Sequence, residues 1–101
     1  MSKPSKQKII KSLLESSFNI HLLEITNESY MHNVPKDSET HFKVILVSND
    51  FTNLALVKRH KAVYDTLKNI MNQIHALSLH RFDIEEYKLN QDVQDSPQCV
   101  N

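Results

Sequence analysis

One short segment constrains the fold of this chain more than any other, the run "HFKVILVS" at residues 41–48. Valine, isoleucine and leucine follow one another at its centre, so a strand formed here has apolar side chains on both faces. That pattern is typical of a strand with neighbours on both sides rather than of an edge strand. We therefore predict that residues 41–48 form the middle strand of a sheet.

Two segments before this strand also show regular patterns. Residues 5–17 carry apolar side chains at helical spacing with lysines between them, which predicts an amphipathic helix. The β-rich run "IHLLEIT", residues 20–26, predicts a first strand, and the turn formers of "VPKDSE" separate it from the middle strand. Because a loop joins these two strands, we expect them to be antiparallel.

The segments after the middle strand predict helices and then a third strand. Asn49 or Asp50 can cap one short helical turn, and a longer helix follows from about Val57. Residues 75–85 return to a period of two, which indicates a strand parallel to the middle one, reached by a right-handed crossover. The expected apolar stripes are Val63, Leu67, Ile70 and Ile74 on the helix, Leu77 and Leu79 on one strand face, and Phe82 and Ile84 on the other.

Length and composition indicate one small domain. The 101 residues, 40% of them hydrophobic, suit a single α+β domain, which we place at residues 1–89 in the order α-β-β-α-α-β. Residues 90–101 are acidic and polar, and we expect a disordered tail there. The N-terminal residues lack the apolar core of a secretory signal and no apolar run is long enough for a membrane span, so we expect a cytoplasmic protein without membrane contact.

Composition also excludes several functional classes. The chain has no glycine, which removes the glycine-rich phosphate loops of nucleotide enzymes. Its single cysteine, Cys99, removes a disulfide framework and cysteine-rich zinc sites. No nucleophile elbow or catalytic triad is recognisable, so we expect neither an enzyme nor a small-molecule substrate. The 12 basic and 12 acidic residues cancel, so any attraction for anions must be local.

The predicted topology gathers three histidines at one end of the sheet. A third strand parallel to the middle one starts at the same end, which places His75 near His41 and near the loop residue His32. Neutral imidazoles there could bind zinc, iron or copper, or could be ordinary polar loop residues. The missing third or fourth ligand suggests that a partner would complete a metal site. His80 differs from His75 by an odd number of positions, so it points to the opposite strand face.

A basic cluster follows the other end of the middle strand. The segment "LVKRHKAVYDTL", residues 56–67, places Lys58, Arg59 and Lys61 near a helix start, where the helix dipole disfavours positive charge. A bound phosphate would relieve that cost, and the preceding short turn supplies a helix-turn-helix outline. The alternative is a cationic helix end that is simply solvated.

Three long segments of this sequence resemble the signature motifs of the BolA family, in the same order and with the same spacing. They are "ESYMHNVPKDSETHFKVILVS", "VKRHKAVYDTL" and "IHALSLH", and the resemblance, closest to the bacterial branch, runs from about residue 8 to residue 89. It implies a single domain similar to class II KH domains, α-β-β-α-α-β, with a three-stranded mixed sheet and the helices on one face. Two departures are Asn53, where the family often has glycine, and Lys61, where it has arginine.

The resemblance implies two activities. BolA-like proteins bind monothiol glutaredoxins and share a 2Fe-2S cluster with the glutaredoxin cysteine and glutathione. The family's ligands match His75 and His32, and His41 could donate a hydrogen bond from behind these ligands. Bacterial members resemble stress-linked transcription regulators that contact promoter DNA, with or without a cluster. The matching residues for that contact are Lys58, Arg59, His60 and Lys61.

Overall fold

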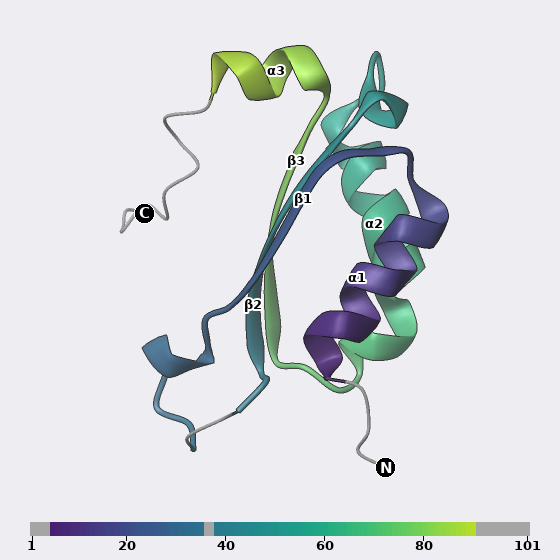
Figure 1. Ribbon diagram of the computed structural model, residues 1–101. Coiled ribbons are helices and arrows are strands. Elements are labelled where there is room, and N and C mark those ends of the chain that lie inside the picture. The colour runs from purple at the N-terminus through teal and green to yellow at the C-terminus, as the bar shows by residue number, and fades with distance from the viewer. Residues whose placement is uncertain (1–4, 36–37, 91–101) are drawn as a thin grey trace.

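The computed structural model describes residues 5–35 and 38–90, which form an α+β domain around one three-stranded sheet (Figure 1). Two long helices lie side by side against one face of the sheet, and a short C-terminal helix lies at one end of it (Figure 1). The elements in chain order are α1 Lys6–Ser17, β1 Ile20–Asn27, the 3₁₀ turn η1 Ser29–Met31, β2 His41–Ser48, the 3₁₀ turn η2 Asn49–Phe51, α2 Leu56–Met71, β3 Ala76–Phe82 and α3 Ile84–Leu89.

The sheet has the predicted topology, with β2 between β1 and β3. Strands β1 and β2 are antiparallel, with Leu23 opposite Leu46, and β2 and β3 are parallel, with His41 opposite Ala76. The central position of β2 is therefore confirmed, and its uninterrupted apolar run is explained by elements that pack on both faces. The parallel pairing also places the start of β3 beside the start of β2.

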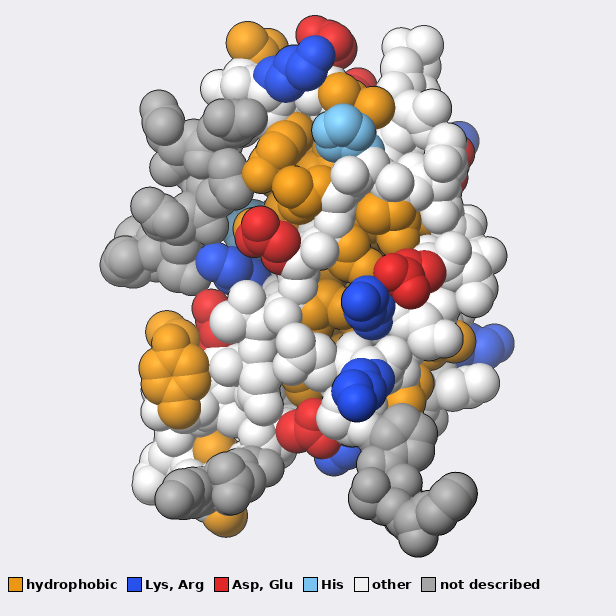
Figure 2. Space-filling model, in the orientation of Figure 1, with side chains coloured by type: hydrophobic (Ala, Val, Ile, Leu, Met, Phe, Trp, Pro, Cys, Tyr) orange, Lys and Arg blue, Asp and Glu red, His pale blue; other side chains and the backbone are white. Residues whose placement is uncertain are grey.

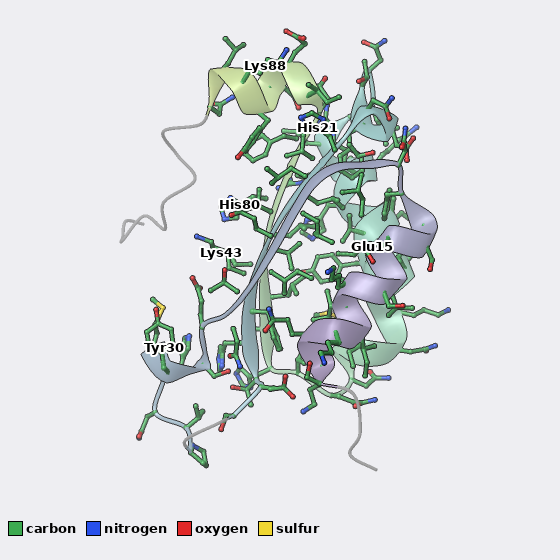
Figure 3. All side chains as sticks on the ribbon, in the orientation of Figure 1. Glu15, His21, Tyr30, Lys43, His80 and Lys88 are labelled. Carbon is green, nitrogen blue, oxygen red and sulfur yellow. The ribbon has the colours of Figure 1, made fainter. Side chains whose placement is uncertain are left out.

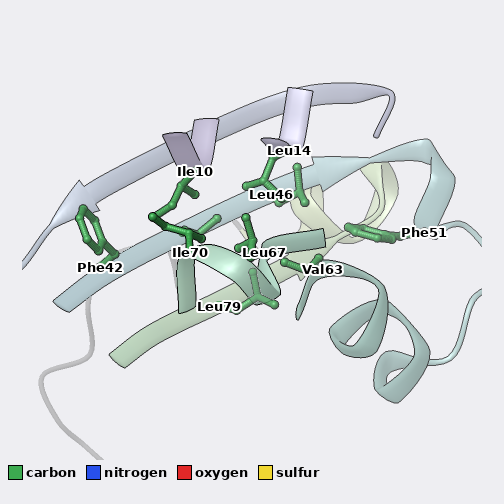
Figure 4. Close-up of a cluster of buried hydrophobic side chains, with 10 residues drawn as sticks. Ile10, Leu14, Phe42, Leu46, Phe51, Val63, Leu67, Ile70 and Leu79 are labelled. Atoms are coloured by element: carbon green, nitrogen blue, oxygen red, sulfur yellow. The ribbon is translucent and has the colours of Figure 1, made fainter. Parts of the chain in front are cut away.

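The main hydrophobic core lies between the sheet and helices α1 and α2 (Figure 4). Alternate residues of β2 point into it, and the helices contribute residues at a spacing of three or four. Each such side chain contributes roughly 1.5–3 kcal/mol by leaving water. The buried members are Ile10, Leu14, Phe42, Val44, Leu46, Phe51, Val63, Leu67, Ile70 and Leu79.

The opposite face of the sheet is partly covered by α3, which the sequence patterns did not predict. Tyr87 of α3 forms a small second core with Ile45 and Val47 of β2, so the expectation that all helices lie on one face is wrong. The predicted strand over residues 75–85 is also too long, because β3 ends at Phe82 and Asp83 starts a helix. The Asp83 carboxylate accepts the Glu86 backbone N–H while the Glu86 carboxylate accepts that of Asp83, which forms a capping box.

The short turn after β2 is present, but its cap differs from the expected one. Ser48, rather than Asn49 or Asp50, is the N-cap residue of η2, and its hydroxyl accepts the Asp50 N–H at 3.0 Å. The same hydroxyl donates to the Asn19 carbonyl at 2.7 Å, which explains why a polar residue can end a buried strand. Asn53 then has a φ of 64°, a left-handed conformation that asparagine tolerates better than most residues other than glycine.

Three other expectations meet different outcomes. Ile74 follows the end of α2 at Met71, although it still packs against the main core. Asn90 is the C-cap of α3, and the predicted disorder of the tail beyond it falls on residues 91–101, outside the described part of the chain. Within the described ranges, no helix combines the length and the apolar character that crossing a membrane would need.

Candidate functional site

Three histidines meet at the end of the sheet where β2 and β3 begin. The rings of His32 and His41 stack with centroids 3.6 Å apart and planes inclined by 14°. The ring of His75 also packs against that of His41, with centroids 4.9 Å apart and planes inclined by 36°. His32 and His75 are exposed and His41 is half-buried. The structure therefore brings together the three residues that topology predicted to share this end, and we call them the histidine cluster.

Two small polar residues hold the backbone of the histidine cluster in place. The buried Ser29 accepts the backbone N–H groups of Thr40 at 2.9 Å and His41 at 3.1 Å through its hydroxyl oxygen. The Thr40 carbonyl in turn accepts the N–H of His75 at 2.7 Å, which fixes that residue one position before β3. Neither Ser29 nor Thr40 was predicted, because a serine or threonine in a polar loop carries no sign of which distant amide it will bind.

The central ring of the cluster is held in its neutral form. The pKa of His41 is lowered from the ordinary value of 6.5, first by desolvation and then by the neighbouring His32 and His75. Its Nδ1 lies 2.8 Å from the Thr40 hydroxyl, so one ring nitrogen is engaged within the protein. His41 is thus an oriented, uncharged imidazole at neutral pH.

The cluster offers imidazole nitrogens at the surface but lacks a full ligand set. Neutral imidazole is a ligand for zinc, iron and copper, and His32 and His75 are the two exposed rings here. Among residues 5–35 and 38–90, no group of three or more histidine, cysteine, aspartate or glutamate side chains has an arrangement that could hold a metal ion. The donor set therefore fits a metal centre only if another molecule supplies the remaining ligands.

Apolar side chains project beside the cluster. Tyr30 and Met31 precede His32 in the turn η1, and their exposed fractions are 80% and 55%. Figure 3 shows Tyr30 on the loop that extends away from the body of the sheet. Because Ser29 anchors this turn to the start of β2, the backbone that carries the two side chains is held next to His32.

His80 is not part of the histidine cluster. It lies opposite Ile45 in the sheet register, on the face away from α1 and α2, and Figure 3 shows it near Lys43. Its Nε2 is 3.5 Å from the Ser78 hydroxyl. Desolvation, followed by the charges of Lys43 and Arg81, lowers the pKa of His80. The prediction that His75 and His80 are separate is confirmed.

The basic cluster at the start of α2 is split between surface and interior. Lys58, His60 and Lys61 are exposed, whereas Arg59 is buried with 4% of its surface exposed. The Arg59 guanidinium donates to both carboxylate oxygens of Glu86, and its Nε donates to the Leu54 carbonyl at 2.7 Å. Arg59 therefore does not belong to a surface that could meet phosphate, which corrects the prediction for this residue.

Two of the three permanent positive charges near the helix start, those of Arg59 and Lys61, are paired with carboxylates of the protein itself. Hydrogen bonding to Arg59 is the largest cause that lowers the pKa of the Glu86 carboxyl. Lys61 donates to Asp65 one turn along α2 at 2.8 Å, and this bond raises the pKa of Lys61. His60 stacks on Tyr64 with centroids 4.4 Å apart. Fewer basic side chains at the start of α2 are therefore available to an external anion than the sequence indicates.

Known proteins resemble this chain over most of its length. Residues 14–86 match the profile of the family described as BolA-like protein. The DNA-binding transcriptional regulator BolA of Escherichia coli is 45% identical over 89% of this chain and 88% of its own, and that of Vibrio cholerae is 43% identical over 93% and 91%. The structure of BolA1 from Arabidopsis thaliana covers 83% of this chain and 98% of its own, with a TM-score of 0.76 and 33% identity. The sequence motifs, the fold and these relatives agree, and the chain therefore belongs to the BolA family.

Proposed function

We propose that this protein is a non-enzymatic, cytoplasmic regulator that binds a monothiol glutaredoxin and shares a 2Fe-2S cluster with it. The observation that carries the proposal is the histidine cluster, in which two exposed imidazoles contact a third that is half-buried and neutral. This arrangement presents ligands without completing a site. A partner that contributes a cysteine thiolate and glutathione would supply what is missing.

In this proposal the three histidines have different tasks. His75 and His32 are the ligands, because both rings are exposed at the end of the sheet. The ring of His41 contacts both of them and limits their orientations, while its own bond to Thr40 keeps it oriented. When bound, a cluster with imidazole in place of thiolate carries less negative charge and has a higher reduction potential.

The surface next to the cluster suits a protein partner. Tyr30 and Met31 offer exposed apolar area directly beside His32, and aromatic and methionine side chains are common at protein interfaces. Because Ser29 already holds the backbone of this turn, that backbone would lose little conformational freedom on association. A relation to class II KH domains remains a prediction, and this docking does not depend on it.

Reconstitution of the shared cluster tests the ligand assignment. The protein is mixed with a monothiol glutaredoxin, glutathione, iron and sulfide, and the visible absorption and circular dichroism of the heterodimer are recorded. We expect His75→Ala and His32→Ala to change or abolish the spectrum, and His80→Ala, on the other face of the sheet, to leave it unchanged. A spectrum that is the same for the wild type and both ligand variants would refute the assignment.

We propose DNA-binding transcription regulation in the stress response as a second function. It is favoured by the bacterial relatives, which are named DNA-binding transcriptional regulators and share 43–45% of their residues with this chain. Lys58, His60 and Lys61 are the candidate contacts, since they are exposed at the start of α2. Such contacts would bind phosphates and position the protein on promoter DNA, without requiring a cluster.

The salt dependence of DNA affinity tests this second function. We expect Lys58→Ala to lower the slope of log affinity against log salt by about 0.9, equally for promoter and scrambled duplexes, because one phosphate contact is lost. Lys68→Ala on the same helix is a matched control, since it removes an exposed lysine ten positions further along α2 from the proposed contact. Measurable DNA binding with an unchanged slope in Lys58→Ala would remove this residue from the site.

A further inference from the structure

The outer edge of β1 is unpaired in the described part of the chain. The sheet order is β1-β2-β3, so β1 has a strand neighbour on one side only. It is an eight-residue strand without proline, and it is therefore long enough to pair with another extended segment. Edge strands of this kind present a row of backbone N–H and C=O groups to any chain that can lie beside them.

The hydrogen bonds identify which residues of β1 face outward. The Glu28 N–H donates to the His41 carbonyl at 2.8 Å, so the alternation of an antiparallel ladder directs Leu23 and Ile25 to the outer side. The side chain of Gln7 supports this orientation, because its Nε2 donates to the Ile25 carbonyl at 2.9 Å. A side-chain amide of α1 thus already occupies a position that the backbone amide of an added strand would take.

A groove runs along this edge, between β1 and α1. Its volume is about 460 Å³, and it is lined by Ser5, Gln7, Lys8, Lys11, Leu23 and Ile25. Figure 2 shows hydrophobic side chains at the surface over β1 and α1, with lysine or arginine side chains beside them. The groove therefore combines an apolar floor, two ammonium groups and an open strand edge.

We propose that this groove binds an extended acidic peptide of a partner protein, which pairs with β1 as a fourth strand. Backbone hydrogen bonds to Leu23 and Ile25 provide the affinity that is independent of side chains. Alternate side chains of the peptide lie over the groove, where carboxylates meet Lys8 and Lys11. The preferred peptide accordingly has acidic residues at every second position.

The charges favour an acidic peptide over a second copy of this chain. Antiparallel pairing of two β1 edges would bring the α1 helices of both copies side by side on the same face of the sheet. Lys8 and Lys11 of one copy would then lie near the same residues of the other, which is repulsive. Duplex DNA would match the lysines, but it has no extended peptide backbone to pair with the strand edge.

A synthetic peptide tests the proposal on the full-length protein. The probe is a short, terminally blocked peptide that alternates glutamate and valine, and the readouts are its affinity and the hydrogen exchange of the Leu23 and Ile25 amides. We expect saturating peptide to slow exchange at these two amides by about tenfold or more, because they become hydrogen-bonded. A peptide of the same sequence with N-methylated backbone amides keeps its charge and should not protect them.

Variants of the groove separate its two contributions. Lys8→Glu combined with Lys11→Glu should weaken binding about tenfold, whereas Lys68→Glu, on α2 and outside the groove, should not. Gln7→Ala should strengthen binding, because it frees the Ile25 carbonyl. The proposal is overturned if the peptide does not bind, if it binds without protecting Leu23 and Ile25, or if the N-methylated peptide binds equally well. It is also overturned if the protein dimerises through this edge or if duplex DNA protects the same amides.

Discussion

Basic side chains gather at both ends of β2, and the two groups have opposite surroundings. At the start of the strand, His32 and His75 are exposed, and their rings pack against that of the half-buried His41. Beyond its end, the Arg59 guanidinium is buried and paired with the Glu86 carboxylate. The histidines at the start of β2 present ring nitrogens to the exterior, whereas Arg59 beyond its end is bound inside the domain.

The difference shows that a local concentration of basic residues does not by itself indicate a binding surface. Arg59 connects α2 to α3 and to the Leu54 carbonyl, so its hydrogen-bonding capacity serves the packing of the C-terminal helix. It also lies near the Phe51 ring, with its central carbon 5.8 Å from the ring centroid. In the part of the chain that the structure describes, the rings of the histidine cluster contact one another and the Thr40 hydroxyl rather than a carboxylate, and the two exposed rings are available to an external group.

The largest expected effect comes from removing the internal anion. Glu86→Ala should lower the free energy of unfolding by about 2–4 kcal/mol, because it leaves a buried guanidinium unpaired and breaks the capping box of α3. Urea denaturation measures the loss. Glu85→Ala is the matched control on the same helix turn, and its exposed side chain should cost at most about 0.5 kcal/mol. Equal losses in both variants would mean that the ion pair is not what holds this region.

A smaller effect is expected from acid. The pKa of the Glu86 carboxyl is lowered from 4.5, chiefly by its hydrogen bond to Arg59, so the folded state binds this proton more weakly than the unfolded state does. The resulting stabilisation is complete above about pH 4.5 and is lost as the pH falls through the lower, folded pKa. Comparing the stability of the wild type and Glu86→Gln from neutral to acid pH isolates this contribution. A difference between the two that does not shrink on acidification would contradict it.

The smallest effect on stability is expected at the histidine cluster. His75→Ala and His32→Ala should each change the free energy of unfolding by no more than about 0.5 kcal/mol, because both side chains are exposed. Thermal or urea denaturation of the isolated protein measures this change in stability. The same variants are expected to alter the spectrum of the 2Fe-2S cluster in the complex with glutaredoxin. A large loss of stability would mean that the histidines are structural, like Arg59.

Much of the fold and part of the site could be predicted from local patterns. The apolar run of β2 indicates its central position, and the helix that follows implies a parallel β3. The meeting of His32, His41 and His75 then follows from topology alone, since it requires only that two parallel strands start at the same end. The resemblance to the BolA family rests on long sequence motifs, and the match of residues 14–86 to the family profile confirms it.

Other features escaped prediction because they depend on partners far along the chain. Arg59 is buried because it pairs with Glu86, which is 27 positions away and belongs to the helix that the sequence patterns did not predict. Helix α3 has only six residues, too few for a clear helical period, and the alternation of the preceding strand appeared to continue into it. The hydrogen bonds of Ser29 and Thr40 likewise join segments that are separated along the chain.

The sequence by itself determined the strand order, the two long helices and the end of the sheet at which the histidines lie. These features follow from side-chain periodicity and from the geometry of strand connections, both of which are local or topological. Only the tertiary structure decided which basic residues are exposed, which backbone groups on the edge of β1 face a groove, and which small polar residues hold the loops. Those outcomes depend on burial and on hydrogen bonds between distant residues, and a local pattern does not encode either one.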